Sequence, residues 1–342
     1  MRSIQQLIKA ASCMTAMTIF FSGCSTAQKS NTAEPVLVPI EAQPGFDDGH
    51  DARALTITTP TGTTTFDSMI AELSTADVIL VGEMHNHTPS LDFIATTFEA
   101  LAPLNPQLVL SMEFYERDEQ IALDDYLAGI TTYEQFLKAS NRSDSNNPID
   151  HLRMVELSKQ LSRPIIASNA PRRYTRLART DGYEALQALT HAQRSMFSIP
   201  STLPTGYYAD RFRDAMGAMA AHGGDEMINS FLRSQSLWDQ TMADSITDHI
   251  RSSGADVFHV VGHFHADYAP IQGGSAMADT IRATMGSGIT IRTLVMHELP
   301  TPDAQPNAEL DAAPYADQAS ASADPEPGPA ADFIVYFPPV QQ

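Results

Sequence analysis

The chain has 342 residues, of which 43% are hydrophobic, and it carries a net charge of −20. A chain of this length can bury a sizeable core and has room for one large domain or two small ones. So acidic a surface repels phosphate backbones and anionic lipid headgroups, which excludes nucleic acid as a partner and a basic patch as a means of membrane contact.

The first two dozen residues have the pattern of a secretory signal peptide. Arg2 and Lys9 precede the apolar run "AASCMTAMTIFF", which is too short to span a bilayer. The stretch "FSGC" resembles a bacterial lipobox, so we expect residues 1–23 to be removed and Cys24 to carry acyl chains such as palmitate. In lipoproteins of this type, Ser25 at the next position favours the outer membrane. The alternative is ordinary cleavage that leaves Cys24 as a thiol.

Cysteine usage limits the chemistry of the mature chain. Cys13 lies in the signal peptide and Cys24 would be acylated, so no free thiol and no disulfide remain. This excludes cysteine nucleophiles, cysteine-ligated zinc and iron–sulfur clusters. Loss of the two basic residues of the signal, Arg2 and Lys9, would bring the net charge to −22.

The sequence predicts a single domain, residues 56–338, with one polar segment before it and a second polar segment within it. Residues 24–55 contain several prolines and indicate a flexible tether to the lipid. Residues 301–332 are rich in Ala, Pro and Asp and contain no basic residue, which predicts a disordered acidic loop. The β-branched and aromatic run 333–337 after it predicts a closing strand.

Within the domain, predicted strands and helices alternate. Short apolar runs typical of strands buried on both faces occur at 78–81, 108–112, 164–168, 257–261 and 289–296. Helical periodicity appears at 88–101, with Thr88 as the expected cap, and at 150–162 and 225–252. This order predicts an α/β fold with a largely parallel central sheet, helices on both faces and helical insertions.

Polar side chains collect directly after the predicted strands. In an open α/β sheet, ligands bind outside the carboxyl ends of the strands, so residues that follow different strands can share one site. The residues in these positions are Glu83, His85 and His87; Glu113 and Tyr115; Arg172 and Arg173; His263, His265 and Tyr268; and His297 and Glu298.

Two of these clusters share the form Gly-x-x-His: "GEMH" at 82–85 and "GHFH" at 262–265. Each offers a glycine for close backbone approach and an imidazole above the sheet. Two imidazoles and a carboxylate can bind a transition metal or orient a water molecule, and Glu83, His85 and His265 form such a set.

Each residue also has a plain structural interpretation. A single histidine after a strand is more often a capping residue, and His87 and His263 are the weakest members. Glu113 alone could begin a helix, and Arg172 could lie in a solvated turn. On the predicted helix 225–252, Gln235 and Asp239 either reach the site or make structural hydrogen bonds. A shared site nevertheless explains why polar residues follow all of these predicted strands.

The motifs together resemble the ChaN-like haem-binding family, within the wider group of TIKI/TraB proteins and erythromycin esterases. The resemblance is carried by "VILVGEMH", "LVLSMEFYERDEQ", "PIIASNAPR", "SQSLWDQTMADSI" and "VVGHFHADY", over roughly residues 67–300. It departs from the family after the first Gly-Glu, where His-Asp-Asn is common and this chain has Met84, His85, Asn86 and His87.

The resemblance implies a haem-binding lipoprotein of the bacterial outer envelope that acts in iron acquisition, with a homodimer as one possible assembly. Haem needs an axial ligand, and the candidates are Tyr115, Tyr268, Tyr207 and Tyr208.

In the wider group the same site supports hydrolysis, which makes an envelope hydrolase the alternative. Glu83 or Glu113 with His85 would activate water, and Arg172 or a divalent metal held by Glu83, His85 and His265 would stabilise negative charge. The chain has no Gly-x-Ser-x-Gly motif, so a serine-esterase mechanism has no support. A third interpretation is a plain binding module for another ligand.

Overall fold

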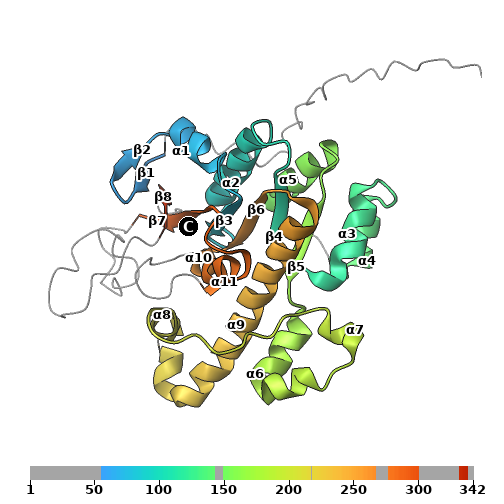
Figure 1. The fold of residues 1–342 in the computed structure, drawn as a ribbon, viewed down its shortest axis with the longest axis vertical. Helices are drawn as coiled ribbons and strands as arrows, with labels where there is room; N and C mark the ends of the chain where they lie inside the picture. The colour runs from blue at the N-terminus through green and yellow to red at the C-terminus, as the bar shows by residue number, and fades with distance from the viewer. Residues whose placement is uncertain (1–54, 143–148, 217, 267–275, 300–330, 338–342) are drawn as a thin grey trace, which may run out of the picture. The chain divides into compact units, whose positions relative to one another are not determined.

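The computed structural model describes residues 55–142, 149–216, 218–266, 276–299 and 331–337. Their centre is an eight-stranded sheet with the order β2-β1-β8-β7-β3-β6-β4-β5 (Figure 1). Every pair from β8 to β5 is parallel, whereas β1 pairs antiparallel with β8 and with β2. The strands are β1 (Ile57–Thr59), β2 (Gly62–Thr64), β3 (Val78–Glu83), β4 (Val109–Glu116), β5 (Ile165–Asn169), β6 (Val257–Gly262), β7 (Ile291–Glu298) and β8 (Phe333–Phe337).

Helices cover both faces of the sheet and make two core layers. One layer contains α1 (Phe66–Leu73), α2 (Thr88–Leu101) and α5 (Ile149–Gln160). The opposite layer contains α9 (Ala218–Ser253) and α11 (Ala276–Met285). The predicted fold class, a largely parallel sheet flanked by helices on both faces, is therefore confirmed.

The sequence of β3 explains how it is buried on both sides. Successive side chains of a strand point to opposite faces. Ile79 and Val81 join the core layer under α2, and Val78 and Leu80 join the layer under α9. An unbroken apolar run is what such a strand requires. Its last residue, Glu83, is therefore the first point where the strand meets a polar environment.

The insertions lie beside and beyond the sheet. A 3-10 helix, η2 (Arg117–Glu119), leads into α3 (Gln120–Leu127) and α4 (Tyr133–Ala139) after β4. The helices α6 (Arg172–Gln187), α7 (His191–Arg194), α8 (Tyr207–Met216) and the short α10 (His263–Ala266) complete the fold. Figure 1 shows α9, in yellow and orange, extending past the sheet to α6 and α8, which pack against it through two small apolar clusters.

Several sequence expectations differ in detail from the structure. The antiparallel hairpin β1–β2 was not expected, because its Thr-rich strands are short. The cap of α2 is His87 rather than Thr88, since His87 Nδ1 accepts the Ser90 backbone N–H at 3.1 Å. The helix expected at 225–252 continues to Ala218 across a break at Gly224, where φ is +66°.

Other expectations fall largely outside the described residues. The signal peptide, Cys24 and nearly all of the predicted tether lie within residues 1–54, and most of the acidic segment lies within 300–330. The last two residues of that segment belong to the fold. Ala331 is buried, and Asp332 Oδ2 accepts the Thr293 backbone N–H at 2.8 Å.

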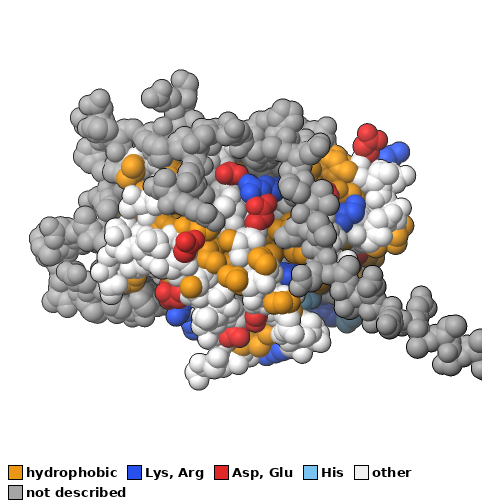
Figure 2. Space-filling view, turned by 90° about the horizontal axis from the view of Figure 1, so that it is seen from above, with side chains coloured by type: hydrophobic (Ala, Val, Ile, Leu, Met, Phe, Trp, Pro, Cys, Tyr) orange, Lys and Arg blue, Asp and Glu red, His pale blue; other side chains and the backbone are white. Residues whose placement is uncertain are grey.

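The described surface agrees with the charge argument. On the face shown in Figure 2, the few blue side chains occur singly, several of them beside red ones. This face therefore offers no broad basic patch within the described part of the chain. Among the described helices, none is long and apolar enough to cross a membrane.

Candidate functional site

The site lies where three neighbouring parallel strands end. β6 lies between β3 and β4 in the sheet, so Glu83, Gly262 and Glu113 come to one edge from three separate parts of the chain. The short helix α10 follows β6 directly and carries His265. The sequence predicted that strand-end residues would share an edge, and this order of strands brings these three together.

Glu83 joins two histidines through its two carboxylate oxygens. His85 Nδ1 donates to Oε1 at 2.9 Å, and His151 Nε2 donates to Oε2 at 2.6 Å. Both Glu83 and His151, which comes from α5, are buried. Burial by itself raises the pKa of Glu83, but the charge and hydrogen bonds of His151 and His85 outweigh it and lower the pKa to about 2. Glu83 is thus a carboxylate at neutral pH.

His85 is the exposed member of this group. Its side chain is 67% exposed, at a turn where Asn86 takes a φ of +60°. The hydrogen bond to Glu83 raises the pKa of His85, against the opposite effect of partial burial and with further help from the charges of Glu83 and Glu113. Because Nδ1 is engaged by Glu83, Nε2 is the nitrogen left for an external ligand.

His265 forms the centre of a second, buried group. Its Nδ1 donates to Asp239 on α9, and its Nε2 lies 3.8 Å from Glu113 Oε1. The amide nitrogen of Gln235 lies 3.1 Å from the same Nε2. Burial lowers the pKa of His265, but the charges of Asp239 and Glu113 outweigh it and raise the pKa to about 9. His265 is therefore an imidazolium held between two carboxylates.

The two Gly-x-x-His motifs fit into one another. A Cβ at Gly82 would lie 2.7 Å from the Cα of His263, and a Cβ at Gly262 would lie 2.9 Å from Nε2 of His85. Each glycine thus makes room for the other motif. The backbone N–H of Gly262 also donates to Glu113 Oε2 at 2.8 Å, which fixes the second carboxylate at the same edge.

Two of the predicted haem ligands, Tyr115 and Tyr208, are buried. Tyr115 is 2% exposed and packs among the rings of Phe114 and Phe136. Tyr208 is buried and donates its hydroxyl hydrogen to Asp239. The side chain of Tyr207 and the whole of Tyr268 lie outside the described residues.

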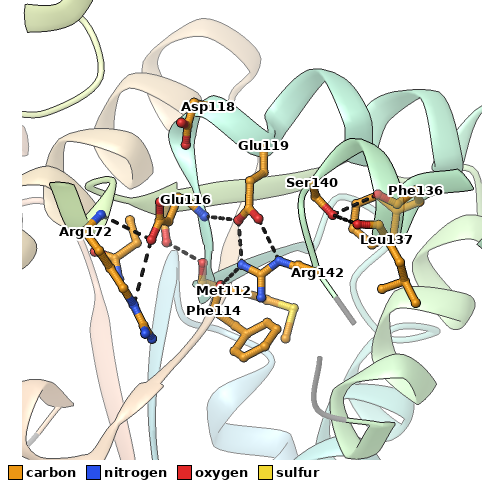
Figure 3. Close-up of polar contacts among 12 residues, drawn as sticks. Met112, Phe114, Glu116, Asp118, Glu119, Phe136, Leu137, Ser140, Arg142 and Arg172 are labelled. Carbon is orange, nitrogen blue, oxygen red and sulfur yellow. Dashed lines mark hydrogen bonds and ion pairs between the residues drawn. The ribbon is translucent and has the colours of Figure 1, made fainter. Parts of the chain in front are cut away.

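The structure places Arg172 away from the histidines. Its side chain is 87% exposed at the end of the edge strand β5, with Nε 3.8 Å from Glu116 Oε1. Figure 3 shows this contact beside Arg142, whose guanidinium group binds Glu119 and the carbonyl oxygen of Phe114. No contact joins Arg172 to Glu83, His85 or His265 among the described residues, so its role in charge stabilisation stays a prediction.

The metal set expected from the sequence is not preorganised. Among the residues that the structure describes, no group of three or more His, Cys, Asp and Glu side chains is arranged to hold a metal ion. Both oxygens of Glu83 are bound to histidines, and His265 Nδ1 is bound to Asp239. These side chains satisfy one another instead of converging on one point.

Sequence reasoning missed His151. It lies in the first turn of a helix, far from any strand end, so the strand-end rule could not find it. The one signal in the sequence was a histidine on the apolar side of the predicted helix 150–162.

Gln235 and Asp239, for which the sequence allows a site role or a structural one, both contact His265. Two histidines expected at the site contact neither Glu83 nor His265 in any described hydrogen bond: His87 caps α2, and His263 is exposed beside the ring of His297.

This fold and this paired histidine–carboxylate site define a class, and comparison with known proteins identifies it. Residues 69–274 match the model of the family described as "Haem-binding uptake, Tiki superfamily, ChaN". The chain therefore belongs to this family, and the resemblance seen in the sequence is confirmed. Among curated proteins, none matches the chain significantly.

Solved structures match this chain at low sequence identity. A structure described as "Cofacial heme binding to ChaN of Campylobacter jejuni" is 16% identical, with a TM-score of 0.58, and the match covers 82% of this chain and 96% of that one. A Bacillus cereus protein is 10% identical with a TM-score of 0.43, covering 82% and 93% of the two chains. A mutant of the erythromycin esterase EreC is 11% identical with a TM-score of 0.44, covering 82% and 97%.

Proposed function

We propose that this protein binds haem and serves haem or iron acquisition as a lipid-anchored protein of the bacterial outer membrane. The observation that carries the proposal is the family match over residues 69–274, which includes the whole strand-end site. The ChaN of Campylobacter jejuni, which binds haem cofacially according to its description, supports the same conclusion. A homodimer stays a prediction.

The residues present fit a haem iron at one position. Iron in haem takes an axial His, Tyr or Met ligand, and imidazole ligands usually donate their other N–H to a carboxylate or carbonyl. His85 has this arrangement, with Nδ1 donating to Glu83 and a ring that is mostly exposed. Tyr115 and Tyr208, in contrast, are buried. Of these three side chains, His85 is the best placed to bind the iron.

Titration of the purified protein with hemin tests this function. The wild type should develop a Soret band, and His85→Ala should lose it or shift it strongly. His191→Ala is the control, because His191 is also an exposed histidine but lies on α7, away from the site. An unchanged hemin spectrum on addition of wild-type protein would contradict the proposal.

A second function, hydrolysis, is favoured by the Glu83–His85 pair. A buried carboxylate that holds Nδ1–H leaves Nε2 to take a proton from water as the water attacks a carbonyl carbon. In this function the imidazolium of His265, with Glu113 beside it, would give a proton to the leaving group. Hydrolysis of ester and peptide panels by wild type, lost in both Glu83→Gln and His265→Ala, would promote this function over haem binding.

A further inference from the structure

Three side chains form a continuous line from the core to the surface: His151, Glu83 and His85. His151 is 3% exposed, Glu83 is 6% exposed, and the His85 side chain is 67% exposed. The two hydrogen bonds of the line, 2.6 Å and 2.9 Å long, use both carboxylate oxygens of Glu83. The line thus connects a helix of one core layer, α5, with the turn after β3.

His151 makes no other polar contact among the described residues. Its Nδ1 is buried and has no hydrogen-bond partner there, so Nε2 is the only ring nitrogen in use. A buried polar side chain with a single partner is costly unless that partner needs it. The partner in this case is a buried carboxylate, and a buried charge without hydrogen bonds on both oxygens is more costly still.

The ring of His151 is itself held in place. Phe114 lies edge-on to it, with ring centroids 5.4 Å apart. Arg142 Cζ lies 4.3 Å from the centroid of the Phe114 ring, and Arg142 is fixed by Glu119 and by the carbonyl oxygen of Phe114 (Figure 3). The position of His151 is therefore determined by the end of β4 as well as by its own helix.

We propose that His151 is a positioning residue, which fixes Glu83 so that Glu83 orients His85 and His85 presents Nε2 to the ligand. His85 Nε2 has no hydrogen-bond partner among the described residues, although the ring is fixed through Nδ1. The ligand is an electron-pair acceptor, and in the proposed function it is the iron of haem. The inference rests on that function only for the identity of the ligand.

The test compares substitutions that keep or remove the donor to Glu83. His151→Leu removes it, and His151→Gln keeps an N–H at about the position of Nε2. Loss of a residue that orients a ligand typically costs about 10–100-fold in affinity. We expect hemin affinity to fall by about 10–100-fold in His151→Leu and by much less in His151→Gln. The control is His87→Asn, because His87 is also a buried histidine after β3 but caps α2 instead of contacting Glu83.

A double-mutant cycle with Glu83→Gln shows whether His151 acts through Glu83. If it does, His151→Leu should cost far less in the Glu83→Gln background than in the wild type. Equal costs in the two backgrounds would mean that His151 contributes only to packing. Melting temperatures of all variants separate loss of fold from loss of affinity, and His151→Gln decides the question if His151→Leu does not fold.

A second readout does not use haem. Diethyl pyrocarbonate acylates imidazole nitrogen, and peptide mass mapping gives the rate at each histidine. In the alkaline range where the acylation rate no longer changes with pH, His85 should react faster than the exposed His191. His151→Leu should remove most of this difference in rate, whereas His151→Gln should retain it. Unchanged reactivity of His85 in His151→Leu would overturn the inference. Failure of hemin to bind wild type, with the reactivity pattern intact, would overturn the proposed function alone.

Discussion

At the scale of single residues, His265 gives the site a measurable pH dependence. Its pKa in the folded protein, about 9, lies above the ordinary value of 6.5 because Asp239 and Glu113 outweigh the effect of burial. A raised pKa contributes stability that is complete below pH 6.5 and is lost as the pH rises through 9. The free energy of unfolding should therefore fall over this range by up to about 3 kcal/mol from this group.

Asp239→Asn tests the origin of this contribution. The substitution removes the charge that most strongly favours the imidazolium, so the pKa of His265 should fall and the pH dependence between 6.5 and 9 should flatten. Urea unfolding at a series of pH values measures it. Asp248→Asn, an exposed aspartate on the same helix α9, should keep the wild-type slope. A steep slope that persists in Asp239→Asn would show that another group is responsible.

The rule that polar residues at strand ends share an edge brought together several site residues, but it does not include the order of the strands. Glu83 ends β3, Glu113 comes just after the part of β4 that pairs with β6, and His85 and His265 follow β3 and β6. Because parallel strands end at one edge, the proximity of these residues could be inferred without coordinates. Arg172 also follows a strand, but β5 lies at the edge of the sheet, two strands from β6. The order of strands is set by tertiary packing, which the local pattern does not contain. His151 reaches the site through the packing of a helix, which the local sequence pattern does not contain either.

At the scale of elements, the close approach of β3 and α10 depends on Gly82. An alanine Cβ there would lie 2.7 Å from the His263 Cα and 3.1 Å from the Ala266 Cβ, and backbone cannot move aside as a side chain can. Gly82→Ala should lower the free energy of unfolding by about 1–3 kcal/mol, as overpacking in a core does. Denaturant unfolding measures this.

Gly288→Ala is the matched control for that measurement. Gly288 is exposed, and a Cβ there would meet no atom within 4 Å. Its effect should stay within about 0.5 kcal/mol, as for most surface substitutions. Equal effects at Gly82 and Gly288 would mean that the contact between β3 and α10 is not tight.

Gly262→Ala should have a different effect, because the obstructing group is a side chain. The new Cβ would lie 2.9 Å from His85 Nε2, and His85, being mostly exposed, can rotate away. Stability should change by less than about 1 kcal/mol. The His85–Glu83 hydrogen bond should be lost, with a drop in hemin affinity of about 10–100-fold. A loss of stability as large as that of Gly82→Ala, or an unchanged affinity, would contradict this geometry.

Long, strongly patterned elements were predictable, and short ones were not. The five buried strands and the closing strand 333–337 were predictable because short runs of apolar and β-branched residues are typical of buried strands. The hairpin β1–β2 has strands of three residues each, rich in threonine, which give no clear period. Threonine is a preferred cap, so the sequence indicates Thr88 as the cap of α2, yet the ring nitrogen of His87 accepts the Ser90 backbone N–H.

At the scale of the whole molecule, charge and anchoring have to be considered together. The chain has a net charge of −20, so an anionic membrane surface repels it. The described residues contain no helix able to cross a bilayer. If the protein resides at a membrane as proposed, the acyl chains expected on Cys24 must supply the attachment, and two or more chains hold a protein stably whereas one does not.

Replacing Cys24 with Ser should therefore move the protein from the membrane fraction to the soluble fraction, because the acceptor of the lipid is gone. High salt should not release the wild type, since screening weakens only electrostatic attachment and this surface is repelled in any case. Cys13→Ser is the matched control, because Cys13 lies within the expected signal peptide and is lost on cleavage. Fractionation and immunoblotting of the three strains, with mass analysis of the N-terminal peptide, measure the outcome. Wild-type protein in the soluble fraction, or Cys24→Ser still bound to membranes, would contradict lipid anchoring.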